Sequence, residues 1–397
     1  TGLASLRAPR GDAKARRDIP VWRRPAALAA EVVLATGLVV GGWFMTRPEP
    51  AIAFSERDWV VVGDLRNMTG QTVLDDSLEQ AFRLSLEQSR YVNVLSDLKV
   101  RDTLGRMRKP SDAFIDRDLA TEIAIRDGAS AVVLPSVAEV GGRMHVSIEL
   151  LDPRSNKTLY ATSAEGESMD SVLDSIDRVT ASLRSTLGES MSALARDSKP
   201  LPQVATHSLD ALRAYALGQE AYGQGNYVLA RDFYLRAIAL DPEFALAHVG
   251  VMRAYNVMDQ LPQGIPFLQK ARELRADMSG RDQVYLDSWV VQIEDPSRAA
   301  DAWALMARIY PDFFPALANA AYALEVQNQH EQAQELAMRA AVPQSEFAPL
   351  SWELVGRLQL ARGDPQGALK SFAEAAKSGL ASAKVWQAAT YAELEDF

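Results

Sequence analysis

The sequence contains no cysteine, and its 397 residues include only four histidines, which lie far apart. The absence of cysteine excludes disulfide bonds, thiolate metal sites and a cysteine nucleophile. The spacing of the histidines is unlike that of a zinc site. We therefore expect neither a metal nor another cofactor and no catalytic residues, so the sequence indicates that this chain is not itself an enzyme.

Basic residues are outnumbered overall, and the net charge of −10 argues against a nucleic-acid partner. The two signs of charge are unevenly distributed along the chain. Residues 1–25 carry seven basic and two acidic side chains, whereas residues 48–397 carry 34 basic and 49 acidic ones. This asymmetry indicates that the two regions lie in different surroundings.

One apolar run, residues 26–46, separates these regions, and Glu31 is its only charged residue. About 20 residues at 1.5 Å each span roughly 30 Å, the thickness of a bilayer core. The sequence thus predicts a single transmembrane helix that contacts the lipid bilayer. Gly37 and Gly41 have the G-x-x-x-G spacing that permits close helix packing, so a homodimer through this helix is one option.

The positive-inside rule places residues 1–25 in the cytoplasm as a basic juxtamembrane linker. Residues 48–397 would then lie in the periplasm of a cell with a single-pass inner-membrane (plasma-membrane) anchor. A cleaved signal peptide is the alternative, because residues 51–53 fit the A-x-A cleavage pattern. The first residue is threonine, so we expect this sequence to be part of a longer protein whose upstream portion is cytoplasmic.

Residues 55–200 predict a small α/β domain. Apolar or alternating runs indicate strands, whereas apolar residues every three or four positions indicate helices. Neither the G-x-x-x-x-G-K-[ST] nor the G-x-G-x-x-G phosphate-binding pattern is present. The expected order is β-α-β-α-α-β-β-β-α, with residues 65–70 as a loop. The expected strands are residues 58–63, 91–95, 131–137, 143–151 and 157–164, and the expected helices are residues 75–89, 98–107, 116–127 and 169–187.

The stretch DWVVVGDLRNMTGQTVLDDSLEQAFRLSLEQSRYVNVLSD, residues 58–97, resembles the amino-terminal domain of TolB and the related FlgO-like domain. The likeness rests on an apolar strand that ends in D-x-R-N-x-T-G, then a helix led by acidic residues, then a second strand. It extends over about residues 55–195. The resemblance implies a binding or assembly module of the bacterial envelope.

Small residues recur with a period of 34–35 over residues 209–397. In the first repeat Gly218, Ala230 and Tyr234 stand at positions 8, 20 and 24, whereas the third repeat has Asp287 and Met306 where small residues are expected. Small residues let two antiparallel helices approach closely, and a large one fills the space between pairs. The repeats begin at about Ala211, Ala245, Gly280, Phe314, Pro349 and Ala383.

This pattern resembles the tetratricopeptide repeat, and it predicts an α-solenoid of about five repeats plus a truncated sixth. In that family, positions 2, 5, 9 and 12 of each first helix line a groove that binds a protein or peptide. The groove could instead pack on the neighbouring domain, or its residues could simply be exposed. The candidate groove residues are Tyr215, Gln219, Tyr222, Arg253, Asn256, Tyr322, Glu325, Glu353 and Arg357.

The order of basic linker, single span, TolB-like domain and repeat array resembles the sensory half of one-span bacterial signalling proteins. Residues 63–104, GDLRNMTGQTVLDDSLEQAFRLSLEQSRYVNVLSDLKVRDTL, resemble the peptide modification system cyclase family. That resemblance implies a class III nucleotide cyclase domain upstream of Thr1 and a periplasmic sensory role for this chain. An exported or anchored envelope adaptor without a linked output domain is the alternative.

Overall fold

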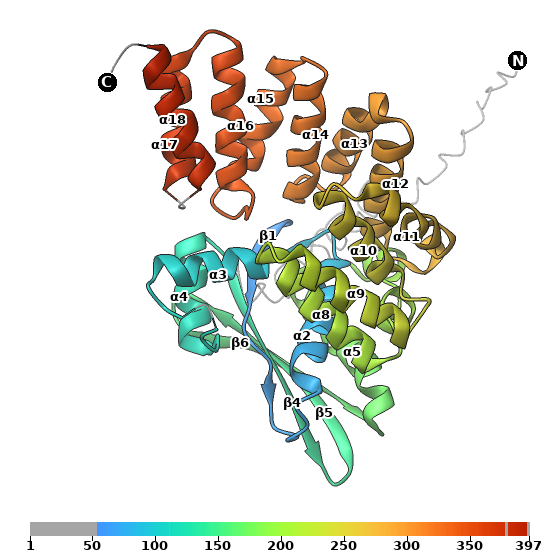
Figure 1. Ribbon diagram of the computed structural model, residues 1–397. Helices are drawn as coiled ribbons and strands as arrows, with labels where there is room; N and C mark the ends of the chain where they lie inside the picture. Colours follow the sequence, from blue (N-terminus) through green and yellow to red (C-terminus); the bar gives the residue numbers. More distant parts are fainter. Residues whose placement is uncertain (1–53, 111, 378–379, 395–397) are drawn as a thin grey trace, which may run out of the picture. The chain divides into compact units, whose positions relative to one another are not determined.

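The computed structural model describes residues 54–110, 112–377 and 380–394 (Figure 1). The predicted linker 1–25 and the predicted transmembrane helix 26–46 lie outside these residues. Within the described ranges, no helix combines the length and the apolar character needed to cross a membrane.

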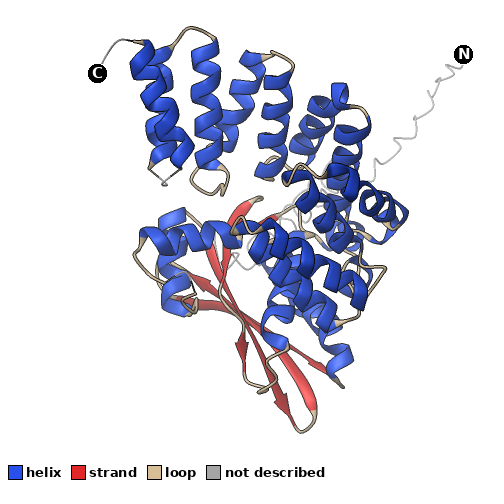
Figure 2. Cartoon of the chain, in the orientation of Figure 1, coloured by secondary structure: helices blue, strands red, loops and turns tan. Residues whose placement is uncertain are grey.

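The amino-terminal part of the described chain mixes strands and helices (Figure 2). Its strands are β1 (Asp58–Val62), β2 (Arg66–Asn67), β3 (Val92–Val94), β4 (Ala131–Val140), β5 (Arg143–Asp152) and β6 (Lys157–Gly166). Its helices are α2 (Leu74–Glu87), α3 (Asp97–Arg106), α4 (Arg117–Asp127), α5 (Val172–Leu187), α6 (Met191–Asp197) and α7 (Leu201–Val204), with a 3₁₀ turn at Met169–Ser171 before α5.

The strands form one mixed sheet in the order β3-β1-β4-β5-β6. Strands β1, β3 and β4 are parallel to one another, whereas β4, β5 and β6 form an antiparallel meander. The predicted strands and the meander are confirmed. The predicted loop 65–70 is partly wrong, because Arg66 and Asn67 form the short strand β2, which pairs with Ser136 and Val137 of β4. A strand of two residues is too short to show the alternation of apolar and polar residues by which strands are predicted from sequence.

The sheet has a different cover on each face. Val60, Val133 and Ile148 point into a core shared with α2 and α5. On the opposite face, Val61 and Val132 pack against α3 and α4. Successive side chains of a strand point to opposite faces of the sheet, so neighbouring valines belong to different cores.

Helix α2 is buried around most of its circumference. It packs against α5, the sheet and α8 (Leu209–Gly223), the first helix of the repeat array. Its apolar residues Leu74, Leu78 and Phe82 belong to a core that continues into the array through Leu212. The α/β domain and the first repeat therefore share one hydrophobic core.

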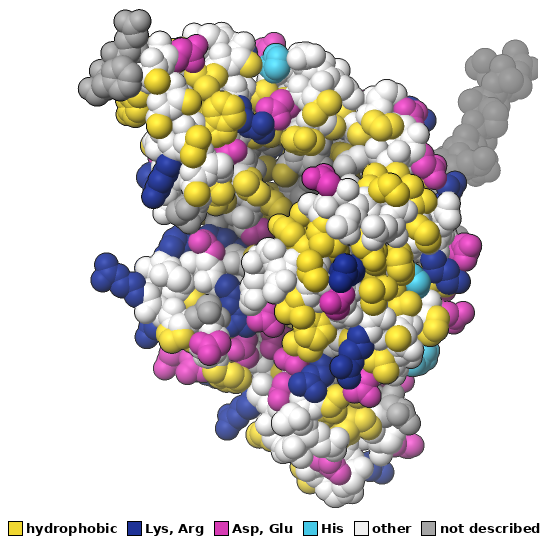
Figure 3. Space-filling view, viewed as in Figure 1, with side chains coloured by type: hydrophobic (Ala, Val, Ile, Leu, Met, Phe, Trp, Pro, Cys, Tyr) yellow, Lys and Arg dark blue, Asp and Glu magenta, His cyan; other side chains and the backbone are white. Residues whose placement is uncertain are grey.

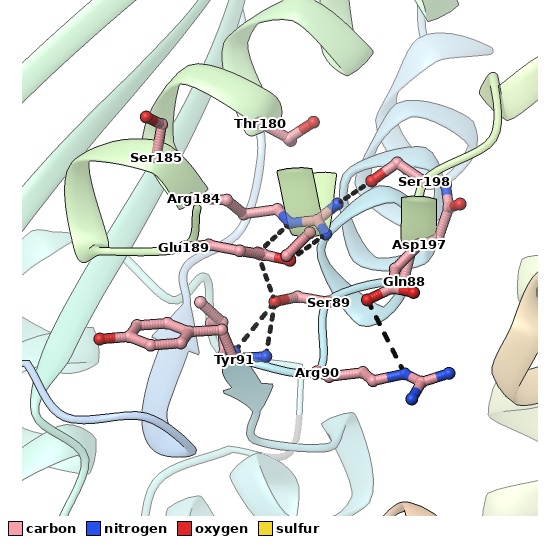
Figure 4. Close-up of polar contacts among 12 residues, drawn as sticks. Gln88, Ser89, Arg90, Tyr91, Thr180, Arg184, Ser185, Glu189, Asp197 and Ser198 are labelled. Atoms are coloured by element: carbon pink, nitrogen blue, oxygen red, sulfur yellow. Dashed lines mark hydrogen bonds and ion pairs between the residues drawn. The ribbon is translucent and has the colours of Figure 1, made fainter. Parts of the chain in front are cut away.

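Buried polar contacts fix the segment between α5 and the array against the end of α2 (Figure 4). The Arg184 guanidinium donates to both carboxylate oxygens of Glu189 at 2.7 and 2.8 Å, and both side chains are 2% exposed. Ser89 at the end of α2 also donates to Glu189, and Arg184 donates to Ser198. Because each polar group has a partner, the ion pair is stable without water.

Asp177 of α5 forms a second tie to the same segment. Its carboxylate accepts a hydrogen bond from the backbone amide of Leu201 at 2.6 Å and another from Ser85 of α2 at 3.0 Å. Burial raises the pKa of Asp177 to about 6, although the two hydrogen bonds act in the opposite direction. Three elements, α2, α5 and α7, thus converge on one side chain.

The rest of the described chain consists of antiparallel helix pairs. Two 3₁₀ turns, at Arg275–Asp277 and Pro296–Arg298, flank the third pair's first helix. The pairs are α8 with α9 (Tyr227–Leu240), α10 (Ala245–Val257) with α11 (Leu261–Glu273), α12 (Gly280–Glu294) with α13 (Ala299–Ile309), α14 (Phe314–Val326) with α15 (His330–Ala340), and α16 (Ala348–Ala361) with α17 (Pro365–Ala376), followed by α18 (Ala381–Glu393).

The packing explains the spacing of small and large residues. A Cβ atom added at Gly218 would lie 2.5 Å from the ring of Tyr234, and one added at Gly250 would lie 2.8 Å from it. Tyr234 is therefore wedged between the first helices of two successive pairs. Any side chain at either glycine would require the ring to move, because real Cβ atoms do not approach so closely.

The third pair departs from the repeat pattern but keeps the same architecture. Asp287 stands where a small residue was expected, and the neighbouring Ser288, 2% exposed, takes the place of the small side chain. Trp303 is fully buried and makes edge-to-face contacts with Trp289 and Tyr285. A larger aromatic core thus compensates for the missing small residues.

We predict that Glu189→Ala lowers the free energy of unfolding by about 3–5 kcal/mol, because it leaves the buried Arg184 cation without its partner. Urea unfolding followed by tryptophan fluorescence measures this change. The matched control is Glu165→Ala, which removes an exposed carboxylate paired with Arg143 at 3.3 Å and should cost less than about 1 kcal/mol. Equal losses in the two variants would contradict a stabilising role for the buried pair.

Candidate functional site

The first helices of the pairs, α8, α10, α12, α14, α16 and α18, form one face of the array, which we call the first-helix face. Among the first helices, α8 contacts α10 directly and α14 contacts α16. In a curved stack the helices on the inner side lie closer together, so the first-helix face is the inner one. The sequence-predicted groove residues all lie on its helices.

Tyr215 was expected to line the groove, and the structure places it in the core instead. It is 5% exposed, and its ring lies 4.9 Å from that of Phe244 and 5.7 Å from that of Tyr234, measured between centroids. The adjacent candidate Gln219 is half-buried and accepts a hydrogen bond from the Tyr234 hydroxyl. Both residues therefore stabilise the junction of the first two pairs.

Tyr222 and Arg253, two further candidates, come together across the α8–α10 boundary. The Arg253 guanidinium lies over the Tyr222 ring, 4.4 Å from its centroid, and 5.8 Å from the centroid of Tyr285 on α12. Arg253, Tyr222 and the candidate Asn256 are all half-buried. A cation over an aromatic face is attracted by the negative potential of the ring.

The remaining candidates lie on the fourth and fifth pairs. Tyr322 is 58% exposed, which is unusual for so large a ring. Arg357 of α16 donates to Glu325 of α14 at 3.1 Å, and Glu353 accepts a hydrogen bond from Ser382 of α18. Of these four candidates, one is an exposed tyrosine, and the other three form polar pairs that bridge successive first helices.

Sequence reasoning predicted the third pair but named no groove residue on it, where Arg281, Tyr285 and Trp289 follow one another every four residues on α12. Arg281 stands at position 2 of its repeat, one of the groove positions, so the repeat register contained the signal. The residues at positions 8 and 27 of this repeat, Asp287 and Met306, depart from the small-residue pattern. Tyr285 packs edge-to-face against Phe313 at 5.5 Å and so links α12 to the loop before α14.

Part of the first-helix face is covered by the chain itself. Asp76 of α2 accepts a hydrogen bond from Arg213 of α8 at 3.1 Å, and Glu87 of α2 accepts one from Arg281 of α12 at 2.7 Å. Leu98 of α3 lies directly against α8, since a Cβ added at Gly223 would be 2.3 Å from it. The packing alternative considered for the groove therefore holds for the first repeats.

A second contact joins the α/β domain to the loop before α14. The Asp312 carboxylate accepts hydrogen bonds from Arg57 Nε at 2.6 Å and Asn93 Nδ2 at 3.1 Å. Beside it, the rings of Trp59 and Phe314 stack with centroids 5.5 Å apart. In the space-filling view, acidic side chains gather on the α/β region where it adjoins the repeats (Figure 3).

A partly buried charged cluster follows the carboxyl ends of β1 and β3. Burial raises the pKa of Glu79 to about 7, although Arg83 lowers it, and burial also raises the pKa of Asp64. Asp64 accepts from the Ile115 amide, and Arg83 donates to Asp97 and to the Leu95 carbonyl. These bonds hold the loops in place. Across the described ranges, we find no group of three histidine or acidic side chains that could hold a metal ion.

No family signature matches the chain, and no curated protein matches it either. Among solved structures, YrrB, described as a TPR protein with an unusual peptide-binding site, is 19% identical over 43% of this chain and 86% of its own, with a TM-score of 0.29. PilW, a type IV pilus biogenesis factor, is 17% identical over 47% of this chain and 86% of its own, with a TM-score of 0.38.

The carboxy-terminal domain of LpoB from Escherichia coli is 14% identical over 31% of this chain and 90% of its own, with a TM-score of 0.28. A match to the Cut9–Hcn1 hetero-tetramer of the APC/C spans 39% of that chain. TM-scores this low carry no argument about function. The helix pairs and their spacing themselves give this chain a mostly helical, tetratricopeptide-like solenoid beside a small sheet region.

We predict that Asp312→Ala loosens the contact between the α/β domain and the middle of the array, because Arg57 and Asn93 lose their shared acceptor. The loss should be about 1 kcal/mol for the half-exposed site. Because the chain has no cysteine, spin labels at Glu122→Cys and Gln366→Cys are its only two labels, and they report on the distance between α4 and α17.

The distance distribution between the two labels should broaden in Asp312→Ala, measured by double electron–electron resonance on the full chain in detergent. Arg143→Ala is the control, since Arg143 pairs with Glu165 in the β5–β6 hairpin. An unchanged distribution in Asp312→Ala would show that the Asp312 contacts do not fix the array.

Proposed function

We propose that this chain is a protein-binding region that recognises a protein or peptide partner on the first-helix face. Solenoids of helix pairs present extended concave surfaces, and such a surface suits an elongated protein segment better than a small molecule. The described residues of this face offer paired charges and aromatic rings, such as Arg357 with Glu325 and Arg253 over Tyr222.

The observation that carries the proposal is the division of the first-helix face. Its first repeats are covered by α2 and α3, whereas the fourth and later pairs present exposed aromatic side chains. Tyr322 is 58% exposed, and Tyr391 on α18 is 44% exposed. Exposed tyrosines near polar pairs are typical anchors of protein interfaces. The partner site therefore comprises the later repeats.

The proposal extends to a membrane-anchored location. Residues 26–46 form an apolar run of bilayer length, and the flanking charge changes from basic to acidic across it. These features support an inner-membrane protein with residues 1–25 in the cytoplasm and residues 48–397 in the periplasm. The span also supplies the contact with lipid and, through Gly37 and Gly41, a route to a homodimer.

Within this location, the chain would be the sensory half of a one-span signalling protein. The support is the likeness of residues 63–104 to the peptide modification system cyclase family, whose cyclase domain would lie upstream. Binding in the periplasm would bias the cytoplasmic domain by favouring one of two arrangements of the helix. The second candidate is an envelope adaptor without an output domain, favoured by the A-x-A pattern at residues 51–53.

A photoreactive phenylalanine analogue in place of Tyr322 tests the partner site in living cells. We expect a specific crosslinked adduct at this position, because the ring is exposed on the uncovered part of the first-helix face. The matched control is the same analogue at Val228, which is 53% exposed on the second helix α9. Equal crosslinking at both positions, or none at Tyr322, would contradict the proposed site.

Amino-terminal sequencing of the chain recovered from bacterial membranes separates the two candidates. The signalling proposal expects residues 26–46 to be retained in the membrane-bound protein. A mature protein that begins at Phe54 would show cleavage after Ala53 and would favour the exported adaptor. A topology reporter fused after residue 54 gives an independent readout of periplasmic location.

A further inference from the structure

The two edge strands of the sheet differ in length and in what covers them. At one edge, β3 has three residues, and its Asn93 donates a hydrogen bond to Asp312 of the array. At the other edge lies β6, whose ten residues, Lys157–Gly166, pair with β5. Among the described residues, the backbone of Thr158–Ala164 makes hydrogen bonds only with β5. The N–H and C=O groups that this stretch directs away from β5 are therefore free to pair with another strand.

The edge formed by β6 lacks the usual protection against pairing. Proteins commonly protect an edge strand with proline, with a bulge or by keeping the strand short. Strand β6 contains no proline, and the register shift of the β5–β6 pair lies beside Leu150 and Leu151, near the start of β6. From Tyr160 onward the pairing is regular, and the exposed side chains of Ala161 and Ser163 are small. An extended chain can therefore approach the backbone along this part of β6.

The charges of β6 favour a second copy of the same strand as the occupant of this edge. The strand begins at Lys157, which is exposed, and the exposed Glu165 lies near its end. Arg143 and His145 contact Glu165 from β5, at 3.3 and 3.7 Å. Two copies of β6 that pair antiparallel about Ala161 place Lys157 of each copy opposite Glu165 of the other. Opposite charges across a strand pair are stabilising, whereas parallel pairing would place like charges together.

The position of α5 is compatible with such a pair. This helix packs on both β5 and β6, and its Ser182 forms a hydrogen bond with Tyr160 of β6. Neighbouring strands of a sheet lie about 4.8 Å apart. In a sheet that continues through two copies of β6, the two α5 helices are separated by two strand spacings, or roughly 10 Å. Because packed helices have this separation, contact between the two α5 helices adds to the strand pairing.

We propose that this chain forms a homodimer in which two copies of β6 pair antiparallel about Ala161 and join their sheets into one. The contacts of β3 with the array lie at the other edge of the sheet, so the pairing leaves them in place. The dimer interface is separate from the first-helix face and from Gly37 and Gly41 in the apolar run. It therefore goes beyond the proposed partner site and does not depend on it.

Cysteine crosslinking in cells that produce the full chain tests the strand pair, because the chain has no cysteine of its own. Ala161→Cys places a thiol at the centre of the pair, and we expect a short bismaleimide to give a covalent dimer. The matched control is Val228→Cys, 53% exposed on α9, which should give little dimer. Both variants also carry Gly37→Ile, which removes close helix packing in the apolar run. Equal dimer yields, no dimer at Ala161→Cys, or a crosslink there to a different protein would each overturn the proposal.

Charge reversal in the Ala161→Cys chain tests the antiparallel register. Lys157→Glu or Glu165→Lys alone places like charges opposite each other at both ends of the pair, so the dimer yield should fall at least about threefold. The double reversal restores opposite charges and should recover the yield. Single variants that crosslink as well as the unreversed chain, or a double variant that recovers nothing, would contradict the proposed pair. Crosslinking at Tyr322 reports on the partner site and is unaffected by either outcome.

Discussion

Helix α2 is the element on which the remaining architecture depends, because it is buried by two structural units at once. One side completes the core of the sheet together with α5, and another side packs on α8 of the array. A helix that is apolar on more than one face cannot be covered by a single sheet. The sheet and the first repeat must therefore dock together, and the hydrophobic effect keeps them so.

This docking also decides which part of the array can bind a partner. The acidic residues Asp76 and Glu87 of α2 lie at the first-helix face and pair there with Arg213 and Arg281. The first repeats thus act as a platform for the α/β domain. The later repeats touch that domain at Phe314 and Gln344 but leave Tyr322 exposed. Arg253 of α10, which lies between these two arginines in the sequence, packs over the Tyr222 ring instead.

The local pattern of the sequence predicted most helices and strands because those elements follow from short-range periodicity. Gly218 and Tyr234 are an example: their spacing predicts a close helix pair, and the structure shows their contact. The third pair was harder to interpret, since Ser288 replaces the expected small residue one position away. Strand β2 was missed because two residues contain no period and form a strand only through pairing with β4.

Groove residues were predicted by position in the repeat, and that rule has a physical limit. The position in the repeat fixes the direction in which a side chain projects from its own helix. Whether that side chain reaches solvent depends on how the neighbouring helices pack around it. Tyr215 and Tyr322 are both groove candidates, yet Tyr215 is 5% exposed and Tyr322 is 58% exposed. The difference arises because Phe244 and Tyr234 enclose the first ring, which no single repeat could reveal.

By itself, the sequence determined the type and order of the elements and the repeat period, because these depend on side chains a few residues apart. It also determined the charge asymmetry around the apolar run. Only the tertiary structure decided that α2 covers the first repeats, that Arg184 and Glu189 fasten the segment between the domains, and that Arg253 lacks an acid. The ion pairs between α2 and the array join residues 137 and 194 positions apart. The Arg184–Glu189 pair is local, but its further partners Ser89 and Ser198 reach it only when both cores have formed.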